Sequence, residues 1–148
     1  MSLNLDQIVL KEVPTPEHIA GLKAKRWWTH RHTFVNDILT KLVTGTQLVA
    51  HPSDTEEVEA FVKCPEKVKV QVVKDHELKL VKMDDCHCHD NSLKLLCRGK
   101  VVEMRSGYAL SDDGLWRHHS WGVEEDGSLV ETTMKRLVYV SSNCIRSL

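Results

Sequence analysis

The hydrophobic pattern of this chain changes its period after Pro65, and this change limits the possible folds more than any other feature. Before Pro65, apolar residues recur at the three- and four-residue spacing of helices, at Ile19, Leu22, Val35, Ile38, Leu39 and Leu42. Thr15 and Pro16 are typical of an N-cap and a first helical residue. We therefore predict an N-terminal helical part over about residues 15–63.

After Pro65, charged and aliphatic residues alternate, as they do in half-buried strands. The stretches 67–73 and 77–83 are predicted to pair as a hairpin. A short helix that stops at Gly99 follows. Then come three strand-like stretches, over 100–110, 115–123 and 128–140. This order predicts an α+β fold, in which the N-terminal helices and the short helix pack on an antiparallel sheet.

Size and charge narrow the class of protein. A chain of 148 residues that is 41% hydrophobic and 28% charged suits a single domain over residues 1–148. Its 20 Lys and Arg and 21 Asp and Glu give a net charge of −1, so no basic field favours nucleic acid. No apolar run nears the roughly 18 residues that span a membrane, and no signal peptide is recognisable. We expect a cytoplasmic protein with neither nucleic acid nor membrane as partner.

The five cysteines are odd in number and scattered, which favours reduced thiols over a disulfide framework. Two of them, Cys86 and Cys88, alternate with histidines in "CHCH", just before the predicted short helix. A helix N-terminus favours the thiolate form of a nearby cysteine. A nucleophilic thiolate also needs an imidazole within hydrogen-bond reach and an acceptor that orients this imidazole.

The segment "LWRHHSWGV" and the acid that follows it offer both partners. Strand alternation puts His119 and His118 on opposite faces, so only one of them can face the site. A three-residue loop over 125–127, with Gly127 left-handed, would place Glu131 on the face of His119. A two-residue turn would place it on the face of His118. We favour the three-residue loop, although the sequence allows either.

Four short motifs follow one another along the second half of the chain: "CHDN" at 88–91, "GYAL" at 107–110, "HSW" at 119–121 and "DGSLVETT" at 126–133. Their order and spacing resemble the core of transglutaminase-like members of the papain-like cysteine enzymes. In that family, a helix-initial Cys precedes strands that carry Gly-Tyr, His-x-Trp and an acid. The resemblance covers about residues 84–140 and implies a papain-like core, with Cys88 as nucleophile, His119 as base and Glu131 as the residue that orients the imidazole.

The resemblance also implies a function and further site residues. It points to a thiol-dependent acyl transferase, or an amide or peptide hydrolase, that needs no cofactor. The substrate would be a peptide, an amide or another acyl compound. Asn91 fits a Cys-x-x-Asn pattern of small bacterial members and is a candidate near the substrate or its oxyanion. Two further candidates come from this sequence itself: Gln71, a polar residue on the predicted hairpin, and Trp121, which follows the histidines. This chain departs from the family in having Glu131-Thr132 where Asp-Pro is usual, and in carrying a second thiol at Cys86.

A second interpretation takes "CHCH" as the centre of a zinc-binding or protein-interaction module. The ligands would be Cys86, His87, Cys88 and His118. Adjacent residues rarely all bind one ion, and the paired C-x2-C spacing of structural zinc sites is missing. A third interpretation is a catalytically inactive papain-like scaffold. A thiol of low pKa would distinguish an enzyme from both alternatives.

Overall fold

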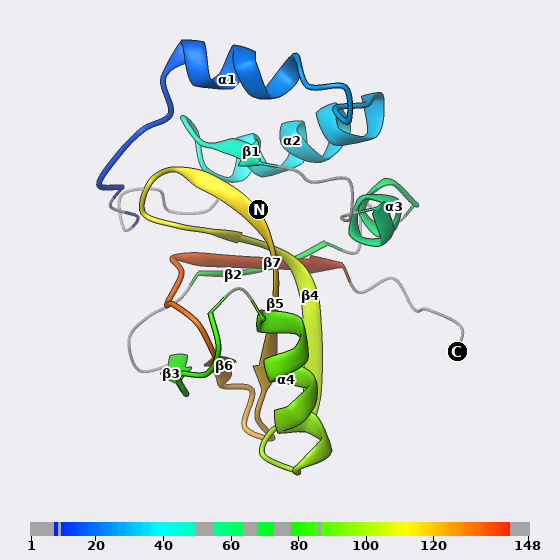
Figure 1. Ribbon diagram of the computed structural model, residues 1–148, viewed down its shortest axis with the longest axis vertical. Helices are drawn as coiled ribbons and strands as arrows, with labels where there is room; N and C mark the ends of the chain where they lie inside the picture. Colours follow the sequence, from blue (N-terminus) through cyan, green and yellow to red (C-terminus); the bar gives the residue numbers. More distant parts are fainter. Residues whose placement is uncertain are drawn as a thin grey trace.

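The computed structural model describes residues 8, 10–49, 55–63, 68–72, 78–85 and 87–142, with no side-chain detail for 55–57, 60, 68–72 and 142. Its elements are α1 (Pro16–Lys23), α2 (His30–Leu42), β1 (Gln47–Val49), α3 (Thr55–Lys63), β2 (Val68–Val72), β3 (Leu78–Leu80), α4 (Cys88–Cys97), β4 (Glu103–Leu110), β5 (Leu115–Val123), β6 (Leu129–Glu131) and β7 (Val138–Ser142) (Figure 1). The predicted α+β class is confirmed.

The N-terminal helices begin where the sequence predicts. The Thr15 side chain accepts a hydrogen bond of 3.1 Å from the His18 amide, and Pro16 is the first helical residue of α1. A break follows α1, and α2 then starts after Thr29, which exchanges capping hydrogen bonds with His32. The range 15–63, predicted as helical, therefore contains three separate helices, and the short strand β1 lies between the second and the third.

The sheet has seven strands and is mixed. Six of them follow the order β2-β7-β4-β5-β6-β3, and β1 pairs with β5 beside this path. The pairs β2–β7, β7–β4, β4–β5 and β5–β6 are antiparallel, as predicted. The short strands β1 and β3 instead join β5 and β6 in parallel. The sheet therefore departs from the purely antiparallel arrangement that we predicted.

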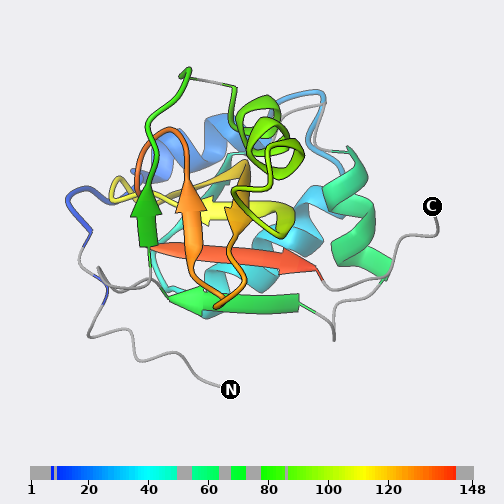
Figure 2. The same cartoon turned by 90° about the horizontal axis from the view of Figure 1, so that it is seen from below.

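The predicted hairpin of β2 and β3 is wrong, although both strands form. They lie at opposite ends of the strand order, β2 on β7 and β3 on β6 (Figure 2). Alternation of polar and apolar residues reveals that a stretch is extended but not which strand pairs with it. The turn segment 73–77 lies outside the described residues.

Both faces of the sheet are buried. Helices α2 and α3 supply Val35, Leu39 and Phe61 to a core that also holds Tyr108 and Trp116 of the sheet. A second cluster is formed by Leu78, Ala109, Trp121, Val123, Leu129 and Tyr139. Helix α4 lies against β4 and β5, and its Leu95 packs with Val101 and Val130. The first residues of α4 are thus held beside the middle of the sheet.

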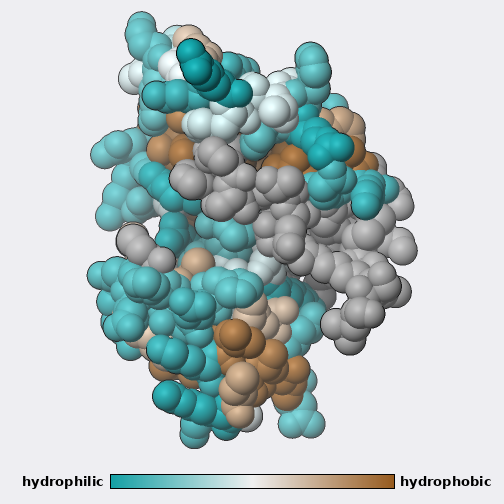
Figure 3. Space-filling model, turned by 45° about the vertical axis from the view of Figure 1, so that its right-hand side comes forward, coloured by the Kyte–Doolittle hydropathy of each residue, from teal (hydrophilic) through white to brown (hydrophobic). Residues whose placement is uncertain are grey.

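The described surface is mostly polar on the face that Figure 3 shows, with apolar side chains gathered toward the end that holds α4. Leu93 in α4 is 44% exposed, and Val102 in the segment after it is 60% exposed. Within the described ranges, we find no helix with the length and apolar character needed to cross a bilayer.

Gly107 allows β4 to approach β7 closely. It lies opposite Ser141 in β7 and opposite His119 in β5. A Cβ atom at this position would lie 2.0 Å from the backbone carbonyl oxygen of Val140. Only glycine fits here without a shift of one strand, and such a shift would also displace the strand partner of His119.

We expect Gly107→Ala to lower the free energy of unfolding by about 2–3 kcal/mol, because the added methyl meets backbone that cannot rotate away. Gly21→Ala is the matched control, since no atom lies within 4 Å of its Cβ position in α1. The free energy of unfolding of Gly21→Ala should equal that of the wild type or exceed it by up to about 1 kcal/mol. Urea denaturation of both variants measures the difference, and equal stabilities would contradict the predicted clash.

Candidate active site

Cys88 is the first residue of α4, and the helix start shapes its surroundings. The preceding His87 has φ −122° and ψ 34°, outside the helical region, and its side chain makes no capping hydrogen bond. The amide groups of the first helical turn therefore lie beside the Cys88 side chain without a side-chain cap. Cys88 is a half-buried free cysteine. A thiolate at this position gains from the partial positive charge of the helix N-terminus.

Asn91 holds the segment before Cys88. Its side-chain amide donates a hydrogen bond of 2.8 Å to the Asp84 carbonyl oxygen, and the residue is only 1% exposed. This contact ties the chain that enters α4 to the first turn of the helix. Asn91 is not among the residues that line the cleft around Cys88.

The turn between β5 and β6 has the three-residue form that we favoured. The Glu124 amide donates to the Ser128 carbonyl oxygen at 2.9 Å, and Gly127 has a φ of 88°. Gly122 is opposite Val130, so this register puts Glu131 on the face that carries His119. The His119 Nε2 atom lies 2.6 Å from Glu131 Oε1. The structure thus brings the predicted base and acid into direct contact.

Glu131 is fully buried, and hydrogen bonds surround its carboxylate. The Tyr139 hydroxyl donates to Oε1 at 2.6 Å. The other oxygen, Oε2, accepts from the Thr132 amide, the Thr133 amide and the Thr133 hydroxyl, each at 3.0 Å. Burial alone would raise the pKa of this carboxyl, but His119, Tyr139 and the Thr133 amide lower it to about 2. Glu131 is therefore a carboxylate at neutral pH.

Two aromatic rings cover the contact between His119 and Glu131. Trp121 stacks on the His119 ring with 6.1 Å between centroids and 26° between planes. Tyr139 packs edge-on against Trp121 at 5.0 Å. Burial, and then the neighbouring Glu131 charge, raise the pKa of Tyr139, which keeps it a neutral donor. Trp121, a sequence-predicted candidate near the substrate, is fully buried in this packing, in which His119 is only 2% exposed.

The thiol and the imidazole influence each other. Burial would raise the pKa of Cys88, but the hydrogen bond and charge of His119, together with the Ser120 backbone, hold it below its ordinary value. Burial would likewise lower the pKa of His119, but hydrogen bonds with Cys88 and Glu131 raise it. Because Nε2 is bonded to Glu131, Nδ1 is the ring nitrogen left for the thiol. Both shifts favour a thiolate–imidazolium pair.

A cleft of about 720 Å³ opens at this pair. Its lining residues are Lys82, Asp85, Cys88, Arg117, His118, His119, Thr133, Met134 and Arg136. His118 reaches this cleft and also packs edge-on against Tyr108 at 6.3 Å, whereas His119 contacts the acid. Of the two adjacent histidines, His119 is therefore the one with the geometry of a base.

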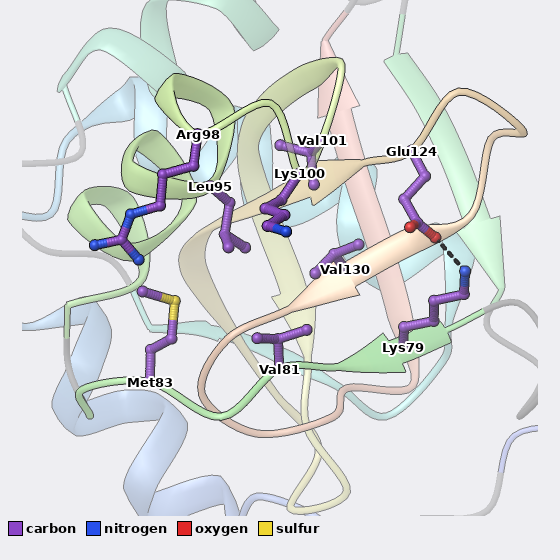
Figure 4. A pocket seen from close by; sticks show the side chains of 9 residues that line it. All are labelled: Lys79, Val81, Met83, Leu95, Arg98, Lys100, Val101, Glu124 and Val130. Carbon is purple, nitrogen blue, oxygen red and sulfur yellow. Dashed lines mark ion pairs between the residues drawn. The ribbon is translucent and has the colours of Figure 1, made fainter.

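A second cavity of about 380 Å³ lies between α4 and the β3–β6 edge (Figure 4). Its floor is apolar, formed by Val81, Met83, Leu95, Val101 and Val130. Lys79, Arg98, Lys100 and Glu124 surround it, and Lys79 forms an ion pair with Glu124 at 2.6 Å. Neither Cys88 nor His119 lines this cavity, so it is separate from the candidate active site.

Two sequence-predicted residues lie partly or wholly outside the described part. Gln71 is paired with Tyr139 in the β2–β7 register, but its side chain is not described. Cys86, the rival thiol and a candidate zinc ligand, lies outside the described residues. Among the residues that are described, we find no group of three or more His, Cys, Asp or Glu side chains placed to hold a metal ion.

Sequence reasoning missed three residues of the site. Tyr139 and Thr133 bond to the acid, and Arg136 lines the cleft. The signal for Thr133 was the run "ETT", since hydroxyl residues after an acid often close a local hydrogen-bonded turn. Tyr139 gave no local signal, because it meets Glu131 only through the pairing of β7 with β4.

Comparisons with models of known protein families, with curated proteins and with solved structures find no match to this chain.

The low pKa of Glu131 predicts how stability depends on pH. Its ordinary value is 4.5 and its folded value is about 2, so the stability that it confers is complete above pH 4.5 and is lost as the pH falls through about 2. We expect the free energy of unfolding to fall between these values by roughly 3 kcal/mol more in the wild type than in Glu131→Gln. Urea denaturation at a series of pH values measures both slopes, and parallel slopes would contradict the shift.

Proposed function

We propose that this protein is a thiol-dependent acyl transferase or an amide or peptide hydrolase, related to the transglutaminase-like branch of the papain-like enzymes. One observation carries the proposal. Cys88, the first residue of α4, and His119 line the same cleft, and His119 holds the pKa of the thiol below its ordinary value. The His119 ring is bonded in turn to the buried carboxylate of Glu131. A nucleophile, a base and a residue that orients the base are the minimal set for acyl transfer through a covalent intermediate.

The first half of the reaction would form an acyl-enzyme. The Cys88 thiolate attacks the carbonyl carbon of an amide or thioester, and the carbonyl electron pair moves onto oxygen. The backbone N–H of Cys88, which has no intrahelical acceptor because Cys88 is the first residue of α4, would donate to that oxyanion. When the intermediate collapses, the bond to the leaving group breaks, and the His119 imidazolium donates its proton to the departing amine or thiolate.

The second half would return the thiolate. His119, now neutral, removes a proton from water or from an amine while that nucleophile attacks the thioester carbonyl. The Cys88–acyl bond then breaks, which restores the thiolate–imidazolium pair and releases an acid or a new amide. Glu131 stays ionised throughout, since its folded pKa is about 2. It holds the ring orientation and stabilises the imidazolium in both halves.

Iodoacetamide alkylation at a series of pH values tests this proposal, with mass spectrometry to locate the modified residue. Cys97 is an exposed free cysteine in the same chain and serves as an internal reference. We expect Cys88 to react at least about tenfold faster than Cys97 at pH 6–7, because its lowered pKa makes more thiolate available. The His119→Ala variant should lose this advantage, while its Cys97 rate stays the same.

Equal reactivity of Cys88 and Cys97 in the wild type, indifferent to His119→Ala, would contradict the enzyme proposal. Measurement of bound zinc would then test the alternative of a metal module. A reactive Cys88 with no turnover of any thioester or amide would favour an inactive scaffold instead.

The Glu131→Gln variant tests whether Glu131, the third residue of the set with Cys88 and His119, positions the imidazole. The substitution keeps a hydrogen-bond acceptor near His119 but removes the charge that stabilises the imidazolium. We therefore expect the pH midpoint of Cys88 alkylation to move upward, toward that of Cys97. Asp90→Asn is a suitable control, because it removes an exposed acid from the first turn of the same helix. An unchanged midpoint in Glu131→Gln would mean that the carboxylate does not influence the thiolate.

A further inference from the structure

Besides its two histidines, the cleft at Cys88 contains three side chains of Lys or Arg, and two of these are already paired with acids. Lys82 forms an ion pair with Asp85 and also donates to the Thr133 carbonyl oxygen at 3.1 Å. Arg117 binds Asp113 through both of its terminal nitrogens, at 3.3 and 2.8 Å. These two cations are therefore largely neutralised within the protein.

Arg136 is the third cation, and its contacts are of a different kind. Its Nε donates to the Met134 carbonyl oxygen at 3.1 Å, and its Nη1 donates to the Ser111 hydroxyl at 2.8 Å. Within the described part of the chain, no carboxylate pairs with it, and its Nη2 atom has no partner. Arg136 is half-buried and lines the cleft together with Cys88 and His119. Of the three Lys and Arg side chains in the cleft, Arg136 is thus the one that no carboxylate of the described residues pairs with.

The Arg136 guanidinium is also held in place before any ligand arrives. Its two neutral acceptors, Ser111 and the Met134 carbonyl, come from different segments and fix the plane of the group. The Arg136 amide bonds to the Tyr139 hydroxyl at 3.3 Å, which links this position to the tyrosine that contacts Glu131. A guanidinium that is already oriented loses little side-chain entropy when it binds an anion.

We propose that Arg136 is a specificity residue that binds a carboxylate of the substrate, so that the preferred substrate carries a carboxylate near its reacting carbonyl group. This proposal rests on the proposed acyl-transfer function and names its substrate class. Neutral oxygen acceptors leave the Arg136 charge available, and a guanidinium binds carboxylates through charge-assisted hydrogen bonds. Asp85, which lines the cleft, is engaged by Lys82, and Asp113, which does not line it, is engaged by Arg117.

Paired alkylating reagents test this inference. Iodoacetate and iodoacetamide differ in charge but deliver groups of similar size to the same thiol. The corresponding pair N-bromoacetylglycine and N-bromoacetylglycinamide places the carboxylate farther from the sulfur. For each pair, we would divide the alkylation rate of the anionic reagent by that of the neutral reagent, separately at Cys88 and at Cys97. The ratio that tests the inference is the Cys88 value divided by the Cys97 value.

We expect this ratio to exceed one in the wild type for at least one pair, and to fall about tenfold in Arg136→Gln, which is the size typical of a lost charged hydrogen bond. Arg136→Lys, which keeps the charge but loses the planar group, should retain part of the ratio. Lys135→Gln is the matched control, because it removes a positive charge from the adjacent exposed residue, which does not line the cleft. That control should leave the ratio unchanged.

The outcomes separate this inference from the function on which it rests. If iodoacetamide modifies Cys88 no faster than Cys97, the acyl-transfer proposal fails. If Cys88 reacts fast but the ratio is the same in the wild type and in Arg136→Gln for both pairs, the carboxylate site is wrong and the proposed function stands.

An experiment on the wild type avoids any folding defect of a variant. At constant ionic strength, glutarate should slow the reaction of iodoacetamide with Cys88 more than glutaramide does. Equal effects of the two compounds would overturn the carboxylate site.

Discussion

The buried carboxylate of Glu131 is the interaction on which the rest of this site depends. A charge with no exposure to water is tolerated only where hydrogen bonds and an opposite charge compensate it. The compensating groups come from β5, from β7 and from the residues directly after β6. Satisfying this carboxylate therefore fixes three segments relative to one another. His119 is oriented as part of the same arrangement, so the stability of the fold and the geometry of the base have one physical origin.

Much of this organisation was predictable from local patterns. The helix start at Thr15, the glycine-closed turn at Gly127 and the contact of His119 with Glu131 all follow from cap, turn and alternation rules that act within a few residues. The pairing of β2 with β7 and the role of Tyr139 were not predictable in this way. Both depend on which distant strands meet, and alternation carries no information about a partner's identity.

The electrostatics of the cleft show a related limit. A net charge of −1 indicated only that no basic field favours nucleic acid. The local charge balance depends instead on which acids contact which bases. Asp113 is four residues from Arg117 and binds it, whereas the described acceptors of the Arg136 guanidinium are neutral oxygens. Composition averages over such differences, and a single unpaired guanidinium in a cleft can dominate recognition even in a chain that is almost neutral.

The turn from Glu124 to Ser128 also has an evolutionary consequence. Surface connections usually accept insertions and deletions, because little depends on their length. Here the number of residues between the strands decides on which side of the sheet Glu131 emerges, since a shift of one residue reverses every side chain that follows. Exchanges of the exposed Glu125 and Asp126 are compatible with the site, whereas a gain or loss of one residue is not. Among descendants of this chain that keep the site, the turn should vary in amino-acid sequence but not in length.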